Sequence, residues 1–470
     1  MASAMGLGER LSTAPKGAKH HGNGRDCSAA LRLMCQLRFL PTARAVGYRS
    51  YAAPRLVLSN FTGTLCVKTE FPEFGQVGKM KHDSTSRRQF LSLAGLTACG
   101  LALGSPLKRR SSSKGELFVY VGTYTTNGRS EGIYVCTLNL STGELRQVDV
   151  AKGVANPSFL TLDPEKRFLY AVNEVKEFEG KASGAVSAFS IDKRTGGLKL
   201  INQQASGGSG PCHLSMDQTG KFLLVANYDA GSFEVLPVRD GALGAPTDIV
   251  QHAGSSVNPK RQASPHAHCV VTDKHNRRVF VSDLGLDKIM IYAFDSRSGK
   301  LSPNQPAWAQ TKPGAGPRHF AFHRNARWAY VINELDSTMS AFAYDQERGE
   351  LREMQTISTL PASFAGKSSC AEVQVAPSGK FLYGSNRGHD SIVVFSIDQT
   401  TGKLNLVEHA LTQGKVPRNF AIEPAGRWLL AANQNSDTVV SFAIDPGSGR
   451  LSPTGHSVGI PVPVCVAFSG

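Results

Sequence analysis

From residue 115 onward the chain repeats one unit seven times, and this repeat constrains the fold more than any other feature. A Gly-x-Leu tripeptide marks each unit, and consecutive copies lie 45 to 58 residues apart. The seven copies begin at Gly143, Gly196, Gly241, Gly299, Gly349, Gly402 and Gly449. Most copies follow an alternating apolar and polar segment that ends in Asp. Strand, Asp, polar turn with Gly, and a second strand is the pattern of a β-hairpin.

A second landmark occurs earlier in the unit, where a Pro begins one short apolar strand and an Asn ends the next. The two residues are 16 positions apart in Pro157…Asn173, Pro211…Asn227, Pro317…Asn333 and Pro417…Asn433. Cys370…Asn386 keeps the spacing without the Pro, and Ala267…Asp283 changes both residues. We interpret the Asn residues as turn formers, because Asn tolerates left-handed backbone conformations and hydrogen-bonds its own backbone. Each unit then supplies four short antiparallel strands, with no helical pattern between them.

A single four-stranded sheet cannot cover its own faces, so repeated sheets of about 50 residues are typical of a β-propeller. The sequence predicts an all-β fold over residues 115–470, a seven-bladed β-propeller of four-stranded antiparallel blades. The N-terminal unit lacks a first strand, whereas the C-terminus ends in an extra one, Pro463 to Phe468. We expect this C-terminal strand to join the N-terminal blade, because closing the ring removes the open sheet edges.

The positive charge of the chain is confined to its N-terminal part. Residues 1–114 hold 18 Lys and Arg against 5 Asp and Glu, whereas the rest of the chain holds 34 against 32. A nearly neutral repeat region does not favour a surface that tracks nucleic-acid phosphates. We therefore expect no nucleic-acid partner.

Residues 80–114 resemble a twin-arginine export signal followed by a linker. Arg87 and Arg88 precede a weakly apolar run, Phe90 to Leu103, which is too short to span a bilayer. No longer apolar run follows, so we expect no transmembrane segment. The segment that ends at Cys99 also resembles a lipobox, in which Cys99 would carry a lipid anchor.

These features predict export to the periplasm or the exterior, with a cytoplasmic location as the alternative. Residues 1–79 show no sustained periodicity and are expected to form an unstructured leader. If export is correct, Met80 is a candidate start of translation, and residues 1–79 would be an over-long gene prediction.

The propeller geometry indicates where a site can form. The first strand of a blade is innermost and pairs with the second, so the start of one and the end of the other lie at the same channel mouth. Residues just after the Pro and Asn landmarks should therefore converge there from every blade. These positions hold unlike polar residues, and charged groups are rarely buried without a partner or ligand. The catalytic candidates are His268, Arg318, Glu334 and Arg387. The candidates for contact with substrate are His213, His266, His319, Arg418, Glu174 and Glu372.

For His213, His266 and His319, packing against backbone carbonyls is the alternative interpretation. No zinc spacing, disulfide framework or calcium motif is visible, and no Cys-x-x-Cys occurs among the five cysteines of the repeat region. We expect these cysteines to act as small buried hydrophobes. We also expect neither a metal nor another cofactor.

At these residues the chain resembles the propeller-type lactonase family, which includes seven-bladed 6-phosphogluconolactonases and the fungal 3-carboxy-cis,cis-muconate cyclase. The matching segments are Gly210-Pro211-Cys212-His213, Pro265-His266-Ala267-His268, Gly316-Pro317-Arg318-His319, Asn333-Glu334, Ser385-Asn386-Arg387-Gly388-His389-Asp390-Ser391, Pro417-Arg418-Asn419-Phe420 and Ala432-Asn433-Gln434. The resemblance implies that a His, two Arg and a Glu at the channel mouth form the catalytic and anion-binding group. By position these are His268, Arg318, Arg387 and Glu334, with His266 a close competitor for the role of the His.

Opening a sugar lactone requires an activated water, a donor to the developing oxyanion and a clamp on the charged end of the substrate. Either His268 or Glu334 is suited to accept the proton of the water. Arg318 can stabilise the oxyanion, and Arg387 with Arg418 can grip a phosphate or carboxylate.

We therefore expect a monomeric lactonase, a hydrolase of a carboxylic ester, that acts on a small anionic or sugar lactone. A carboxymuconate-type cyclase or isomerase is the first alternative, and a propeller that binds a protein or glycan is the second. An exported protein would not meet a cytosolic phosphosugar lactone, so export favours an unphosphorylated aldonolactone.

Overall fold

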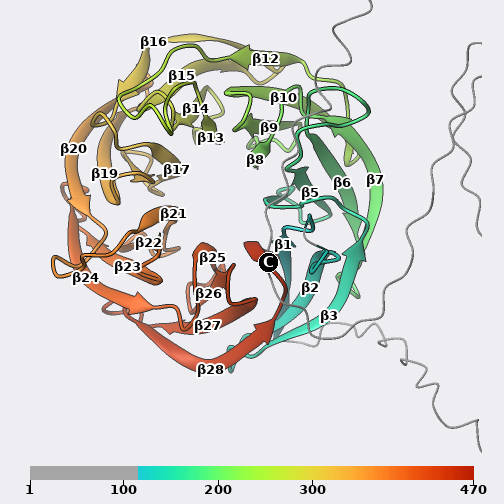
Figure 1. Ribbon diagram of the computed structural model, residues 1–470, viewed down its shortest axis with the longest axis vertical. Helices are drawn as coiled ribbons and strands as arrows, with labels where there is room; N and C mark the ends of the chain where they lie inside the picture. The colour runs from blue at the N-terminus through green and yellow to red at the C-terminus, as the bar shows by residue number, and fades with distance from the viewer. Residues whose placement is uncertain (1–114, 127, 470) are drawn as a thin grey trace, which may run out of the picture. The chain divides into compact units, whose positions relative to one another are not determined.

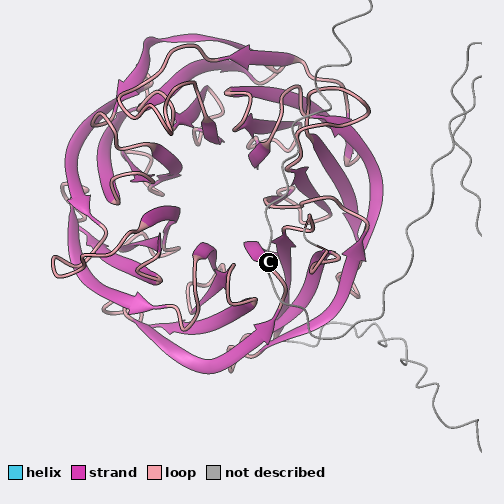
Figure 2. Cartoon of the chain, viewed as in Figure 1, coloured by secondary structure: helices cyan, strands magenta, loops and turns pink. Residues whose placement is uncertain are grey.

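The computed structural model describes residues 115–126 and 128–469. Every regular element in this part is a β-strand, and the strands form seven sheets arranged around a central axis (Figure 1). In Figure 2 the described residues are drawn as strands and loops, with no helix among them. The structure therefore confirms the predicted seven-bladed β-propeller. The export signal, Cys99 and the leader over residues 1–79 lie outside the described residues.

Blades are numbered in chain order, and their strands are given from the axis outward (Figure 1). Blade one holds β29 (Pro463–Phe468), β1 (Glu116–Thr123), β2 (Gly132–Asn139) and β3 (Leu145–Lys152). Blade two holds β4 (Leu160–Leu162), β5 (Phe168–Asn173), β6 (Ala185–Ile191) and β7 (Leu198–Ala205). Blade three holds β8 (Pro211–Met216), β9 (Phe222–Asn227) and β10 (Ser232–Arg239), and its outermost position is shared by β11 (Ala242–Leu243) and β12 (Asp248–Gln251).

The remaining four blades follow the same order. Blade four holds β13 (Ala267–Thr272), β14 (Arg278–Asp283), β15 (Lys288–Asp295) and β16 (Lys300–Gln310). Blade five holds β17 (Pro317–Phe322), β18 (Trp328–Asn333), β19 (Thr338–Asp345) and β20 (Glu350–Ser358). Blade six holds β21 (Ser369–Val375), β22 (Phe381–Arg387), β23 (Ser391–Ile397) and β24 (Leu404–Leu411). Blade seven holds β25 (Pro417–Ile422), β26 (Trp428–Asn433), β27 (Thr438–Ile444) and β28 (Leu451–Gly459).

The C-terminal strand closes the ring as expected. β29 pairs antiparallel with β1, with Val119 opposite Phe468 and Gly122 opposite Cys465. The first blade therefore takes its innermost strand from the end of the chain and its other three strands from the beginning of the repeat region. This pairing leaves no seam between the first and last repeats.

The hydrophobic core is divided among the blade interfaces. Seven clusters of buried apolar side chains are present in the described residues, and each one draws its members from two neighbouring blades. The cluster between blades seven and one, for example, packs Val119 and Leu138 against Leu430 and Val439. A blade therefore buries its faces only by stacking on its neighbours, as the repeat argument requires.

The glycine of each Gly-x-Leu turn also forms part of a blade interface. All seven glycines have φ between 68° and 82°, a left-handed conformation that favours glycine. A Cβ built on Gly402 would lie 2.5 Å from the ring of Trp328, which belongs to the preceding blade. The equivalent neighbour of the other six glycines again lies at or near the start of the second strand in the preceding blade: Phe118, Phe168, Phe222, Arg278, Phe381 or Trp428. The turn motif therefore also brings adjacent blades into close contact.

The interpretation of the Asn landmark as a left-handed turn residue is wrong. None of Asn173, Asn227, Asn333, Asn386 and Asn433 has a positive φ. Most of their side-chain amides donate to carbonyls in the connection from the preceding blade; Asn227 Nδ2 donates to the oxygen of Ser206 at 2.7 Å, for instance. Asn is favoured here because its amide satisfies a buried backbone acceptor, not because it tolerates a particular φ.

Four of the five cysteines confirm their expected role, and Cys212 belongs to no apolar cluster. All five cysteines in the described residues are free and buried. Cys136, for example, packs in the apolar cluster between blades seven and one.

Replacing a blade-interface glycine should destabilise the fold. Gly402→Ala places a methyl group against Trp328 at a φ of 76°, and we expect it to lower the free energy of unfolding by about 2–4 kcal/mol. Gly455→Ala is the matched control, because Gly455 has a φ of 80° with no atom within 4 Å of a Cβ there. The control should lose only about 1 kcal/mol. Urea denaturation of both variants measures the difference, and equal losses would rule out the steric contribution of the interface.

Candidate active site

A β-bulge follows the Pro landmark in the innermost strands. Pro317 pairs with Asn333 and His319 pairs with Ile332, which leaves Arg318 without a cross-strand partner. The same shift in three other blades leaves Cys212, His268 and Arg418 unpaired. In β21 the shift is larger and spans Ala371 and Glu372. Bulges redirect side chains and are common beside active sites. Here they occur at equivalent positions around one mouth of the channel.

A cavity of about 270 Å³ lies at this mouth, and its lining comes from six of the seven blades. It is lined by Glu174, Cys212, Tyr228, Arg261, His268, Glu334, Arg387 and Arg418. Five of these residues are sequence-predicted site residues, namely His268, Glu334, Arg387, Arg418 and Glu174. Residues from distant parts of the chain therefore converge as the ring geometry predicts.

Glu334 is the centre of the charged cluster. Its Oε2 accepts from Arg318 Nε at 2.9 Å and from Arg387 Nη2 at 2.8 Å. Its Oε1 accepts from Arg261 Nη2 at 2.7 Å. One carboxylate therefore holds three guanidinium groups from blade five, blade six and the connection into blade four.

This arrangement sets the charge of the cluster. Burial alone would raise the pKa of Glu334, but Arg387, Arg318 and Arg261 hold it far below its usual range. Burial lowers the pKa of Arg387 to about 10, so this group stays protonated at neutral pH. Glu334 is therefore ionised, and three cations share one anion in this part of the site. The excess of two positive charges favours an anionic ligand.

A second polar cluster lies on the arc formed by blades seven, one and two. Glu174 Oε2 accepts from Tyr124 Oη at 2.8 Å and from the hydroxyl of Ser158. Tyr124 Oη in turn accepts from Arg418 Nη2 at 2.8 Å. Here one carboxylate is matched by one cation, so this arc is close to neutral. Its hydroxyl and carboxylate groups are suited to hydrogen-bonding the hydroxyls of a sugar.

His268 lines the cavity between these two arcs. Its Nδ1 lies 3.7 Å from Cys212 Sγ, and its ring contacts Tyr228 edge-on at 5.3 Å between centroids. Burial, together with nearby Arg318, lowers the pKa of His268 well below its usual value. The imidazole is therefore neutral at physiological pH and retains a free lone pair for a proton.

Aromatic and imidazole rings pack against one another next to the cavity-lining His268. The ring of Phe159 lies 4.4 Å from that of His213 and 5.6 Å from that of His319. His213 and His319 lie 5.2 Å apart, and His319 lies 5.3 Å from His268. Side chains from blades two, three and five therefore meet beside His268, and we call the rings of Phe159, His213 and His319 the floor of the cavity.

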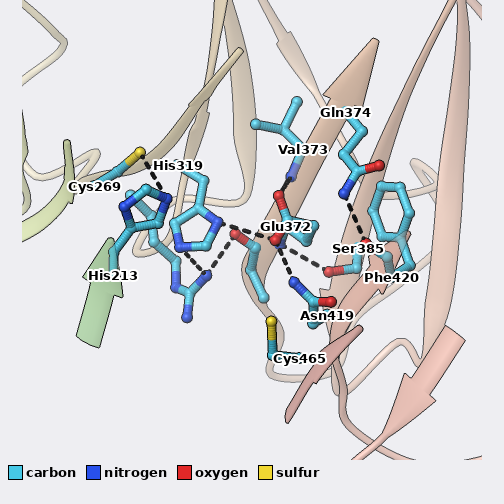
Figure 3. A network of polar contacts seen from close by, with 12 residues as sticks. His213, Cys269, His319, Glu372, Val373, Gln374, Ser385, Asn419, Phe420 and Cys465 are labelled. Atoms are coloured by element: carbon cyan, nitrogen blue, oxygen red, sulfur yellow. Dashed lines mark hydrogen bonds and ion pairs between the residues drawn. The ribbon is translucent and has the colours of Figure 1, made fainter. Parts of the chain in front are cut away.

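A buried hydrogen-bond network continues from the floor into blades six and seven (Figure 3). Arg318 Nη1 donates to His319 Nε2 at 3.2 Å, and His319 Nδ1 lies 3.2 Å from Glu372 Oε2. Glu372 also accepts from the amide of Asn419 and from the backbone N–H of Val373. Burial raises the pKa of Glu372 to about 8, although Arg318 partly offsets this effect. Through His319, this network orients the guanidinium group of Arg318.

Five sequence-predicted residues lie outside the cavity lining. Arg318, at 2% exposure, lies just behind it and is held by Glu334, His319 and the carbonyl oxygen of Ala371. His213, His319 and Glu372 are buried in the floor and the network beneath it. His266 is stacked on Tyr228 at 4.4 Å, and its Nδ1 lies 2.9 Å from the carbonyl oxygen of Tyr228. Of the three histidines, His266 has the backbone-carbonyl contact of the alternative interpretation. His213 instead accepts from the backbone N–H of Val270, and His319 contacts the side chains of Arg318 and Glu372.

Sequence reasoning missed Arg261, Tyr228 and Cys212 as lining residues. Arg261 belongs to residues 252–266, the longest connection between two blades in the described part of the chain. The available signal was the spacing from Gly241 to Gly299, which at 58 residues is the largest in the repeat. Tyr228 and Cys212 follow the Asn and Pro landmarks, but the sequence prediction selected only His, Arg and Glu residues at these positions.

Within the described residues, no group of three or more His, Cys, Asp or Glu side chains could hold a metal ion. No helix in that same part of the chain is long and apolar enough to cross a membrane.

Comparisons with known proteins agree with this geometry. The family model described as lactonase, 7-bladed β-propeller, matches residues 118–468. A 6-phosphogluconolactonase of Bacillus subtilis is 38% identical over 351 residues, which cover 74% of this chain and 97% of the relative. A 6-phosphogluconolactonase of Formosa agariphila is 37% identical over 309 residues, which cover 65% of this chain and 86% of the relative. The solved structure of the periplasmic gluconolactonase of Pseudomonas aeruginosa has a TM-score of 0.71 at 37% identity, and the match covers 75% of this chain and 99% of that one.

The raised pKa of Glu372 predicts a pH-dependent stability. Its pKa is about 8 in the folded protein against an ordinary value of 4.5, so the unfolded chain loses this proton first. The contribution of Glu372 to the free energy of unfolding therefore falls as pH rises from about 4.5 to about 8. Between pH 6 and pH 9, wild type should lose about 2–3 kcal/mol more than Glu372→Gln, whose side chain does not titrate. Urea denaturation at both pH values gives the change in the free energy of unfolding for wild type and for Glu372→Gln. Equal changes in the two proteins would contradict the prediction.

Proposed function

The chain belongs to the seven-bladed β-propeller lactonase family, and we propose that it hydrolyses a sugar-derived lactone that carries an anionic group. One observation carries this proposal: a neutral imidazole and an excess of positive charge face each other in one small polar cavity. The 6-phosphogluconolactonases of Bacillus subtilis and Formosa agariphila support the reaction class. The reaction forms a bond from a water oxygen to the lactone carbonyl carbon and breaks the ring ester bond.

His268 is the better candidate for the general base. Both oxygens of Glu334 are engaged by three guanidinium groups, so Glu334 is less open to an attacking water. His268 is neutral, lines the cavity and keeps a ring nitrogen available to an attacking water. We therefore assign His268 to accept the proton and Glu334 to position the arginines.

The arginine cluster provides the electrostatic stabilisation. As water attacks, negative charge develops on the carbonyl oxygen of the lactone, and fixed cations in a low-dielectric site stabilise this charge strongly. Arg387 faces the cavity directly, whereas Arg318 acts from just behind the lining. Glu334 and the network through His319 and Glu372 hold both arginines in place before substrate arrives.

The substrate pool depends on the compartment. The predicted twin-arginine signal leads us to propose export, and the periplasmic gluconolactonase of Pseudomonas aeruginosa supports this proposal. An exported enzyme would not meet a cytosolic phosphosugar lactone. The unphosphorylated aldonolactone expected from the sequence is neutral, whereas the excess positive charge of the site favours a lactone that carries a carboxylate. A carboxymuconate-type cyclase is the second candidate, because two excess positive charges also suit a polycarboxylate.

Loss of the proposed base should abolish most of the activity. His268→Gln should reduce kcat for lactone hydrolysis by roughly 100- to 10,000-fold, the usual contribution of a general base. His275→Gln is the control, because His275 is exposed and lies outside the cavity. Proton release from the hydrolysed lactone is followed with a pH indicator after subtraction of the spontaneous rate.

The same assay separates the alternatives. Wild-type rates from His268→Gln would remove the assignment of the base. A loss of diene absorbance from a carboxymuconate, without lactone hydrolysis, would favour the cyclase.

A further inference from the structure

The connection between blades three and four presents one arginine to the cavity on a rigid support. Gln262, which follows Arg261, is fully buried, and its Nε2 donates to Asp287 Oδ1 at 2.8 Å and to the carbonyl oxygen of Leu284 at 2.9 Å. Ser256 donates to the other oxygen of Asp287 at 2.5 Å. The connection is therefore attached to blade four by the side chains of Ser256 and Gln262, on both sides of Arg261.

The side chain of Arg261 is less constrained than its backbone. It is 42% exposed, whereas the side chains of Arg318 and Arg387 are 3% and 13% exposed. Both of its hydrogen bonds use the same nitrogen, Nη2, which donates to Glu334 Oε1 at 2.7 Å and to Tyr228 Oη at 3.2 Å. Among the described residues, no group accepts from its Nε or Nη1. Two guanidinium donors of Arg261 thus remain available to a ligand.

The charge balance indicates which ligand these donors suit. The excess positive charge lies on the arc where Glu334 is shared by Arg261, Arg318 and Arg387. The opposite arc pairs Glu174 with Arg418 through Tyr124 and is balanced. An anionic substituent is therefore most stable beside Arg261, and the hydroxyls of the same molecule then face Glu174. A planar guanidinium with two free donors matches the oxygens of a phosphate or a carboxylate.

We propose that Arg261 is a specificity-determining residue that binds the anionic substituent of the lactone, and so selects charged lactones over neutral ones. This inference rests on the proposed lactonase function. In this proposal, residues 252–266 recognise the anionic group of the substrate, while His268, Arg318 and Arg387 act on the lactone ring.

The test compares substrates that differ in charge. The values of kcat/KM are measured for 6-phosphogluconolactone, for gluconolactone and for the lactone of an aldaric acid, which carries a carboxylate. Wild type should prefer a charged lactone, and the preferred one identifies the group as phosphate or carboxylate. Arg261→Gln should lower the ratio of charged to neutral kcat/KM by about 10- to 100-fold, mainly through KM, and Arg261→Lys should restore part of it. Arg297→Gln, at an exposed turn of blade four, is the matched control for the loss of one charge.

A binding experiment separates this inference from the proposed function. Titration calorimetry with 6-phosphogluconate and with an aldarate needs no turnover, and the preferred anion should bind about 10- to 100-fold more weakly to Arg261→Gln than to wild type. Weakened binding without any lactone hydrolysis by wild type would overturn the proposed function and keep the role of Arg261. Hydrolysis with no preference for charged lactones, or an equal loss for all substrates in Arg261→Gln, would overturn the role of Arg261. Urea denaturation confirms that the compared variants are folded.

Discussion

The structure depends on the fact that no blade can bury its own faces. Each apolar cluster is shared by two blades, so removing one neighbour exposes a face of the next. Only a closed ring satisfies every blade at once, and the pairing of β29 with β1 provides that closure. The seven glycines of the turn motif serve the same constraint, since they let each turn approach the preceding blade more closely than any side chain would permit. A rigid ring in turn fixes the distances between groups that are far apart in the sequence.

A symmetrical ring acquires an asymmetrical site through the bulges of its innermost strands. The bulge recurs after the Pro landmark and leaves one residue unpaired at equivalent places around the mouth. Because an unpaired residue does not have to match a cross-strand neighbour, its type is free to vary between blades. Cys212, His268, Arg318 and Arg418 occupy this one position. The backbone geometry is repeated, and the chemistry is carried by the side chains that it presents.

This division explains what could be predicted from the sequence. The blade count, the closure and the mouth of the channel follow from spacings, because strand pairing converts a constant spacing into a constant position. The depth of each side chain does not follow, because it depends on the hydrogen bonds of the individual side chain and, in β21, on a larger register shift. Arg318 was expected to line the cavity but lies behind it, and Glu372 follows the larger shift of β21 into the buried network. Arg261 does not occupy a repeated position. The repeat therefore indicates only that the connection holding Arg261 is longer than the others.

The shared carboxylate of Glu334 explains how so many arginines can exist in one cavity. Three buried or half-buried guanidinium groups would repel each other strongly without a counter-charge, and three separate carboxylates would leave the site neutral and indifferent to an anion. A single carboxylate resolves both problems, because it orients all three groups through its two oxygens and still leaves positive charge uncompensated. The same bonds keep Glu334 ionised and engaged by three cations, and this is the basis for proposing it as a positioning residue rather than as the proton acceptor. The proposed separation of His268 as proton acceptor from Glu334 as positioning residue is therefore consistent with the electrostatics of the cluster.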